Sequence, residues 1–250
     1  MGEDKLNYPP RIKKICRLSM ARADRMLDIG CGDGHYVLLF GDIFDIRELY
    51  GVDVSMRAVS KARANGIRAS HVNIDKQPLP YMDGRFDVVF AGEIIEHLLN
   101  PDLLLNEIYR ILKKEGICVI TTPNLASWYN RIQLLFGYQP YAIPASHKHR
   151  GAGAFWPGAR DSMVSGGCYS PSYNIAGGYV YHIRFYTSKG ITALVRCHGF
   201  EAVRTLGASY DEAVLTMPGI LSRIIRVLDT VISNTRSSLA SRSIIVGVKP

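Results

Sequence analysis

The feature that most constrains the fold is the segment from Arg25 to Tyr36, which reads RMLDIGCGDGHY. Its first part is a short apolar run around one carboxylate, Asp28, as is typical of a buried parallel strand that ends at a ligand. Glycines follow at once, and residues without a Cβ let the backbone turn sharply and let a ligand approach closely. The apolar segment 35–40 predicts a helix whose first N–H groups point toward that ligand. We therefore expect a strand, a glycine loop and a helix that together bind a nucleotide.

The spacing of the glycines indicates which nucleotide is bound. Dinucleotide folds use G-x-G-x-x-G, whereas Gly30, Gly32 and Gly34 form G-x-G-x-G, with Asp28 two positions ahead. A carboxylate there would repel a pyrophosphate, but it can accept a hydrogen bond, through water, from the ammonium of an amino-acid moiety. This favours S-adenosylmethionine over NAD. The segment 27–34 resembles the first motif of the class I S-adenosylmethionine-dependent methyltransferases; the alternative is a glycine turn that arose by chance.

Two further carboxylates follow the next two expected strands. Segment 48–53 predicts a strand that ends at Asp53, where a carboxylate can accept both hydroxyls of a ribose. The alternative role of Asp53 is to cap the helix expected over 56–64, for which Ser55 is equally suited. A third strand is expected over 67–74, and the acid after it, Asp75, matches the family position that accepts from the adenine amino group. With the neighbours that this resemblance implies, the expected cofactor contacts are Asp28, Gly30, Cys31, Gly32, Asp53, Val54, Asp75 and Gly92.

A second cluster follows the fourth expected strand, 86–91. Glu93, Glu96 and His97 are spaced i, i+3 and i+4, so on a helix they share one face, at the strand end where open α/β sheets carry their site. In a structural interpretation, the acids favour the helix N-terminus and His97 packs on the sheet. In a catalytic one, His97 and Glu96 take a proton from an acceptor hydroxyl.

A third interpretation makes Glu93, Glu96 and His97 ligands of a divalent cation. The E-x-x-E-H order is similar to that of ubiquinone-pathway O-methyltransferases and small-RNA 2′-O-methyltransferases, in which it is associated with such a metal. The sequence leaves the three interpretations open.

Helices and strands alternate regularly through the first half of the chain. Asn100 is suited to cap a helix over 103–114, a fifth strand is expected over 117–122, and a helix over 125–136. Such alternation predicts right-handed crossovers and a parallel sheet.

The pattern breaks at 137–181, a segment rich in Gly, Pro, Tyr and Ser. Its length favours a substrate lid inserted after strand five; the alternative is a loop whose polar residues only solvate it. His147, His149 or His182 could complete a metal site or act as a base, and spacing selects none of them.

Regular elements return after the insertion. A helix over 189–197, capped by Thr187 or Ser188, precedes a strand over 200–206. Segment 217–232 predicts an amphipathic helix that covers the sheet; the alternative is contact with an anionic membrane. The last strand, 243–248, enters antiparallel beside strand six in the resembled family. The expected fold is thus α/β and Rossmann-like: a seven-stranded, mostly parallel sheet with helices on both faces. Its parts are an N-terminal cap (1–24), a cofactor-binding core (25–136), the lid (137–181) and the C-terminal part of the core with the amphipathic helix (182–250).

Composition limits the location and the partners. The five cysteines are odd in number and form no C-x-x-C pair, which is typical of reduced thiols in a cytoplasmic protein. No stretch of about 18 apolar residues predicts a transmembrane segment. The net charge of +8 is compatible with nucleic acid, but no run of five basic residues occurs.

Together these features predict a methyltransferase that uses S-adenosylmethionine to methylate a hydroxyl of a small or lipid-like molecule. Two alternatives are an RNA 2′-O-methyltransferase with a Glu/Glu/His metal site and a non-catalytic binding protein of the same fold.

Overall fold

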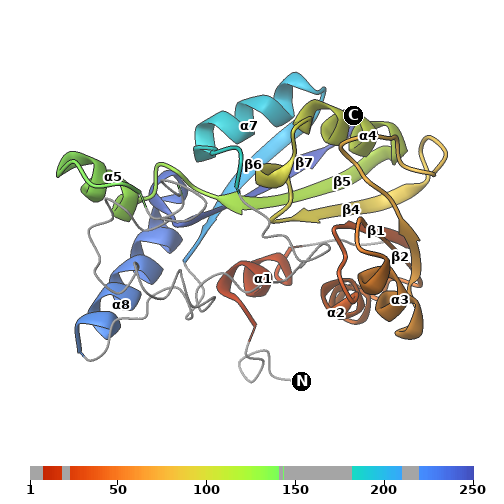
Figure 1. Ribbon diagram of the computed structural model, residues 1–250, viewed down its shortest axis with the longest axis horizontal. Coiled ribbons are helices and arrows are strands. Elements are labelled where there is room, and N and C mark those ends of the chain that lie inside the picture. The colour runs from red at the N-terminus through yellow and green to blue at the C-terminus, as the bar shows by residue number, and fades with distance from the viewer. Residues whose placement is uncertain (1–7, 19–22, 141–142, 144–181, 210–219) are drawn as a thin grey trace.

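A computed structural model describes residues 8–18, 23–140, 143, 182–209 and 220–250, and these residues form one seven-stranded sheet (Figure 1). The strands are β1 (Arg25–Ile29), β2 (Glu48–Asp53), β3 (Arg68–His71), β4 (Phe86–Gly92), β5 (Leu112–Pro123), β6 (Glu201–Ala208) and β7 (Arg242–Val248). Their order in the sheet is β3-β2-β1-β4-β5-β7-β6. The first five pair in parallel, and β7 is antiparallel to both β5 and β6. The mostly parallel sheet and its antiparallel last strand confirm the prediction.

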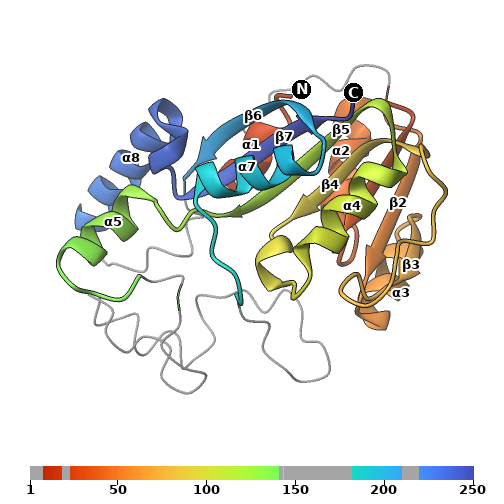
Figure 2. The same cartoon turned by 90° about the horizontal axis from the view of Figure 1, so that it is seen from above.

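Helices cover both faces of this sheet. They are α1 (Pro10–Ile15), α2 (His35–Phe44), α3 (Met56–Ala64), α4 (Pro101–Ile111), α5 (Trp128–Leu135), α7 (Ser188–Cys197) and α8 (Ile220–Thr235), with short 3-10 turns η2 (Ile95–His97) and η4 (Ser237–Leu239). Figures 1 and 2 show α4 and α7 on one face and α1, α2 and α3 on the other. Ile108 of α4 and Ile191 of α7 are fully buried in one core, while Phe40 of α2 and Val59 of α3 are buried in the other. Because both faces are buried, the central strands are almost entirely apolar.

Three helices begin where the sequence predicts a cap. The side chain of Ser55 accepts a hydrogen bond from the Ala58 N–H, and that of Asn100 accepts one from the Leu103 N–H. Thr187, rather than Ser188, caps α7. Each side-chain oxygen satisfies an N–H that the helix itself leaves without a partner.

Some element boundaries differ from the expectation. The helix expected to reach Lys114 ends at Ile111, because Leu112 is already extended and pairs with Phe86 of β4. The strand therefore begins earlier than predicted, and an irregularity that includes Glu115, with a left-handed φ of 63°, separates its two paired parts. β3 is shorter than the predicted 67–74.

The α-helical arrangement expected for Glu93, Glu96 and His97 is wrong. Glu93 has a left-handed φ of 55°, and only the 3-10 turn η2 follows it. The three side chains therefore do not share one helical face.

The last helix does not lie across the sheet as expected. Both views show α8 beside α5, beyond the end of β5 (Figures 1 and 2). None of its described apolar side chains belongs to either core. The predicted lid lies outside the described residues apart from 137–140 and 143. No helix in the described ranges has the length and hydropathy needed to cross a membrane.

Candidate functional site

The glycine loop lies between β1 and α2, at the carboxyl end of the parallel strands. Gly30, Gly32 and Gly34 have φ of 79°, 58° and 86°, a region that residues with a Cβ rarely adopt. The N–H groups of Gly30 and Cys31 donate to the carbonyl of Val52, which fixes the loop against the end of β2. A Cβ at Gly30 would lie 3.0 Å from Ile94. The loop therefore needs glycine both for its conformation and for its close approach to the β4 side.

Asp53 holds this loop in place. One carboxylate oxygen accepts from the Gly32 N–H at 3.0 Å, and the other accepts from the Ser55 N–H at 2.8 Å. Burial raises the pKa of Asp53, although these two backbone hydrogen bonds act in the opposite direction. Each carboxylate oxygen has a second lone pair, so the positions suited to ribose hydroxyls stay available. The structure thus gives Asp53 a role in positioning the loop that the sequence did not reveal.

Asp28 is the most unusual group of the site. Its side chain is 3% exposed, and its carboxylate accepts no hydrogen bond from any described residue. Burial, and to a lesser degree the carboxylate of Asp53, raise the pKa of Asp28 to about 8. A buried carboxyl group without a partner is costly unless it is protonated or meets a cation. A ligand that carries an ammonium group meets this requirement, so the site fits the amino-acid moiety of S-adenosylmethionine.

Three other predicted cofactor contacts, Asp75, Val54 and Gly92, already contact other residues of the protein. Asp75 accepts from the Asn100 N–H at 2.9 Å, which fixes the segment before α4. The carbonyl of Val54 contacts the ring of His71 at 2.8 Å. Gly92 closes β4, and a Cβ there would lie 2.4 Å from the ring of Phe90.

Cys31 is buried and packs against the backbone of β2. A Cβ at Gly51 would lie 2.6 Å from its sulfur atom. Burial strongly raises the pKa of the Cys31 thiol, so it stays protonated near neutral pH. Its contribution to the site is therefore packing beneath the loop.

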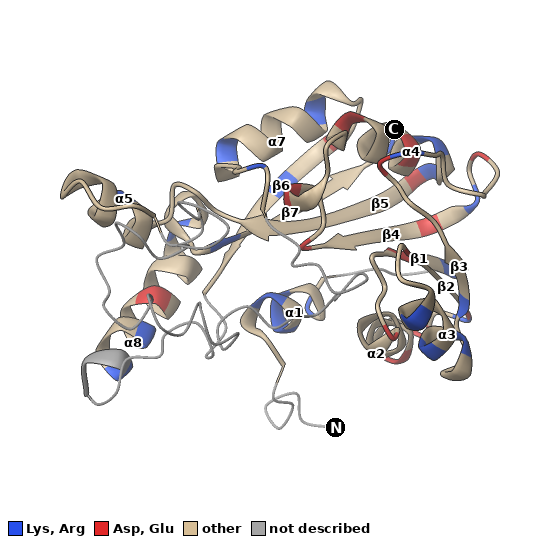
Figure 3. Ribbon diagram, viewed as in Figure 1, with Lys and Arg blue, Asp and Glu red and all other residues tan. Residues whose placement is uncertain are grey.

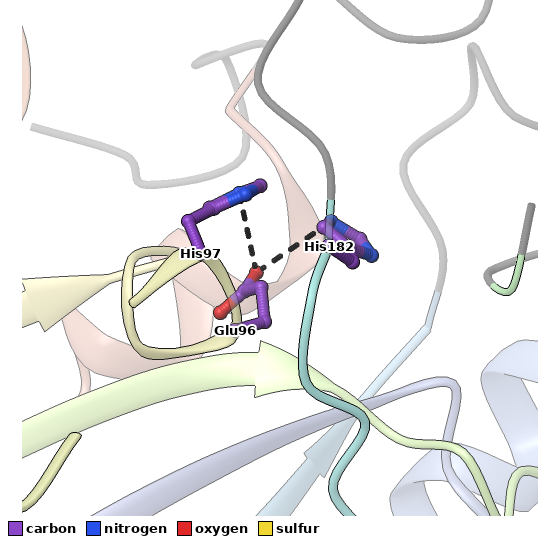
Figure 4. Close-up of side chains that lie close together, drawn as sticks. All are labelled: Glu96, His97 and His182. Atoms are coloured by element: carbon purple, nitrogen blue, oxygen red, sulfur yellow. Dashed lines mark ion pairs between the residues drawn. The ribbon is translucent and has the colours of Figure 1, made fainter. Parts of the chain in front are cut away.

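A second cluster joins Glu96 and His97 of η2 with His182, which precedes α7 (Figure 4). One Glu96 oxygen, Oε1, lies 4.0 Å from Nε2 of His97 and 3.8 Å from Nε2 of His182. One ligand atom from each residue can be chosen so that all lie within 4.8 Å of one another. Side chains 85 residues apart in the chain thus converge on one point.

The side chain of Glu96 is 1% exposed, and only one of its two carboxylate oxygens accepts a hydrogen bond from a described residue. Its Oε2 accepts from the hydroxyl of Thr122 at 3.0 Å, whereas Oε1 has no hydrogen-bond partner among the described residues. Burial raises the pKa of Glu96 to about 7. The group can therefore either accept a proton near neutral pH or bind a cation.

Backbone hydrogen bonds hold His182 near this carboxylate. The N–H groups of Ile183 and Arg184 both donate to the carbonyl of Glu96, at 2.9 and 3.0 Å. The Arg184 guanidinium also donates to the carbonyls of Leu98 and Leu99. These hydrogen bonds therefore hold the segment before α7 against η2. No local sequence signal distinguishes His182 from His147 and His149, both of which lie outside the described residues.

Glu93 is not part of this cluster. Its carboxylate forms an ion pair with Arg242 of β7 and accepts from the Thr121 hydroxyl at 2.9 Å. Nε of Arg11, on α1, lies 3.9 Å from the same carboxylate. The expected grouping of Glu93 with Glu96 and His97 is thus replaced by one with His182, because the left-handed Glu93 turns toward β5 and β7.

The fold, the glycine loop and the carboxylates after β1 and β2 resemble those of class I S-adenosylmethionine-dependent methyltransferases. Comparison with known proteins agrees: residues 27–120 match the family model described as a methyltransferase domain. Residues 27–120 are therefore similar to a methyltransferase domain.

Curated relatives match over the same part of the chain. A probable S-adenosylmethionine-dependent methyltransferase of Mycolicibacterium smegmatis is 34% identical over 101 residues, which is 40% of this chain and 38% of the relative. A ubiquinone biosynthesis O-methyltransferase of Rhodopseudomonas palustris is 32% identical over 111 residues, 43% of each chain. The chain thus spans well under half the length of these relatives.

Solved structures match over nearly the whole chain. A methyltransferase from Mesorhizobium loti has a TM-score of 0.59 and 17% identity, and the match covers 99% of this chain and 100% of that one. For a putative methyltransferase solved in complex with the Haloferax volcanii Trm112 activator, the TM-score is 0.61, the identity 16% and the coverage 96% and 89%. At these identities the likeness shows the fold.

Proposed function

We propose that this protein transfers the methyl group of S-adenosylmethionine to a hydroxyl of a small or lipid-like molecule. The observation that carries the proposal is the buried carboxyl of Asp28, which accepts no hydrogen bond from a described residue, beside a loop of left-handed glycines. The Asp28 carboxyl can pair with a cationic group of a ligand once it has released its proton, and the glycine loop leaves space where a nucleoside can approach the backbone. Bound there, the cofactor supplies an electrophilic methyl group on its sulfonium.

The chain has to orient the acceptor and to remove one proton. Glu96 Oε1 faces His97 and His182 without a hydrogen bond from a described residue, and its raised pKa of about 7 suits proton transfer near neutrality. We assign Glu96 and His97 to this step. Relatives named as O-methyltransferases, such as the malonyl-[acyl-carrier protein] O-methyltransferase of Legionella pneumophila, support an oxygen acceptor.

Calorimetric titration with S-adenosylmethionine tests the cofactor assignment. Wild type should bind, and Asp53→Ala should weaken binding, because it removes the expected ribose contact and frees the Gly32 N–H. Asp33→Ala is the matched control, since Asp33 lies in the same loop but is exposed. The assignment fails if wild type does not bind or if Asp53→Ala binds as tightly as Asp33→Ala.

As the alternative role of the cluster we propose a divalent cation held by Glu96, His97 and His182, in which case Glu96 and His97 are ligands and do not themselves remove the proton. Glu96 Oε1, which has no hydrogen-bond partner among the described residues, and the two imidazoles form a carboxylate–histidine donor set of the kind that binds Mn²⁺, Fe²⁺ or Zn²⁺. A cation there would orient and acidify an acceptor hydroxyl.

Metal content of untagged protein and titration with Mn²⁺ test this site. His182→Ala should lose the bound ion, whereas Glu93→Gln should keep it, because Glu93 pairs with Arg242 instead. Protein without bound metal that also ignores added Mn²⁺ would refute the site and leave the cofactor proposal untouched.

Methylation of RNA is not favoured. Figure 3 shows Lys and Arg spread over α1, α3, α7 and α8 rather than along one continuous stripe. The four described cysteines are free thiols, which supports the expectation of a reducing, cytoplasmic compartment.

A further inference from the structure

Helix α5 buries two polar residues, Asn130 and Gln133, and exposes several apolar ones. Asn130 is fully buried and Gln133 is 4% exposed. In contrast, Ile132 is 47% exposed and Leu135 is 80% exposed, with Leu134 and Phe136 between these values. A surface helix of a globular protein shows the opposite distribution, because water favours the polar side. The outer side of α5 is therefore suited to an apolar environment.

Helix α8 likewise buries polar residues and exposes apolar ones. Its buried residues include Asp229 and Ser233, both 2% exposed. Its exposed residues include Val227 at 62% and Val231 at 54%. The reversal therefore occurs in two helices that are about 90 residues apart in the chain.

A polar contact joins the inner sides of these helices. Trp128 Nε1 of α5 donates to Asp229 Oδ1 of α8 at 2.8 Å, and the Ser241 hydroxyl donates to the same oxygen. Both views show the helices side by side beyond the carboxyl end of β5 (Figures 1 and 2). We call their exposed apolar residues the α5–α8 platform: Ile132, Leu134, Leu135, Phe136, Ile224, Val227, Leu228 and Val231.

Apart from the buried Asp229, the charged residues of α5 and α8 themselves are all arginines. Arg131 of α5 and Arg223 of α8 are exposed, and Arg226 is half-buried. The single acid in the two helices, Asp229, is buried against Trp128. A second copy of the chain, docked by the same platform, would bring these arginines near one another, because a two-fold contact places like surfaces face to face. An anionic lipid surface offers acyl chains for the platform and headgroup charges for the arginines.

We propose that the α5–α8 platform docks on the surface of an anionic lipid bilayer. The platform lies beyond the carboxyl end of β5 (Figure 1), and Glu96 and His97 follow the carboxyl end of β4, which pairs in parallel with β5. Docking would thus hold the candidate site close to the bilayer. The proposal does not depend on the cofactor or on the identity of the acceptor.

Co-sedimentation with vesicles tests the proposal on the full chain. Wild type should bind vesicles of phosphatidylcholine mixed with phosphatidylglycerol, should bind phosphatidylcholine alone far less, and should be released by 0.5 M salt. Arg223→Glu with Arg226→Glu should weaken binding more than tenfold, since each basic residue near an anionic surface contributes roughly fivefold. Leu135→Asp should also abolish binding.

Met82→Asp is the matched control, because Met82 is 75% exposed and lies outside the platform. Circular dichroism checks that each variant is folded. The proposal is overturned if wild type binds neither vesicle, if it binds both equally, or if Leu135→Asp binds like Met82→Asp. A dimer would also overturn the proposal. In that case sedimentation velocity would show a wild-type dimer that Leu135→Asp dissociates, and wild type would not bind vesicles, since a second copy would cover the platform.

Discussion

Replacing Asp28 by Asn should make the protein more stable than wild type at alkaline pH and should lower its affinity for the cofactor. The carboxyl is 3% exposed and its pKa is raised from 3.8 to about 8, chiefly by burial. The folded protein therefore holds a proton that the unfolded chain has already released above pH 4. Stability must fall as the pH rises through this window, because the folded state binds more protons than the unfolded state.

The magnitude follows from the shift in pKa. Each pKa unit corresponds to about 1.4 kcal/mol, so the free energy of unfolding should fall by at most about 4 kcal/mol between pH 5 and pH 8. Asn has nearly the same shape as a protonated Asp but does not titrate. At pH 5 the two proteins should therefore unfold with similar free energies, and the advantage of Asp28→Asn should grow with each pH unit.

Urea denaturation at pH 5, 6, 7 and 8 measures this difference. Asp33→Asn, a change of an exposed acid in the same loop, is the control and should follow wild type. Titration with S-adenosylhomocysteine in buffers of different ionisation enthalpy should show proton release at pH 7 for wild type only, because the ligand ammonium stabilises the ionised Asp28. Parallel stability curves for wild type and Asp28→Asn would refute the reasoning.

Two further substitutions test how the site is supported. Gly34→Ala should cost about 1–3 kcal/mol more than Gly66→Ala in urea denaturation. Both glycines have a φ of 86°, but only at Gly34 would a Cβ collide with Ile67, at 1.8 Å, so equal costs would contradict the packing argument. Glu93→Gln should lower the free energy of unfolding by about 1–3 kcal/mol, because it removes the carboxylate that pairs with the partly buried Arg242. An unchanged melting temperature would show that this ion pair contributes little.

The local signals in the sequence were enough for most of the fold. Short apolar runs located all seven strands, and cap residues such as Ser55 and Asn100 located the starts of their helices. These signals work because each depends on residues within one turn or one strand of each other. Local signals do not predict an element boundary that depends on a neighbouring strand. Helix α4 ends earlier than predicted because Leu112 pairs with Phe86 of β4.

The sequence by itself determined the order of the strands along the chain, the glycine loop and the acids that follow the strands. Only the tertiary structure decided that His182 joins Glu96 and that Glu93 pairs with Arg242 instead. It also decided which side of α5 faces inward: Asn130 is buried and Ile132 is 47% exposed. The physical reason is the distance along the chain over which each signal acts. Strand and helix signals depend on near neighbours in the sequence, whereas contacts between distant residues depend on which helices and strands meet at one edge of the sheet.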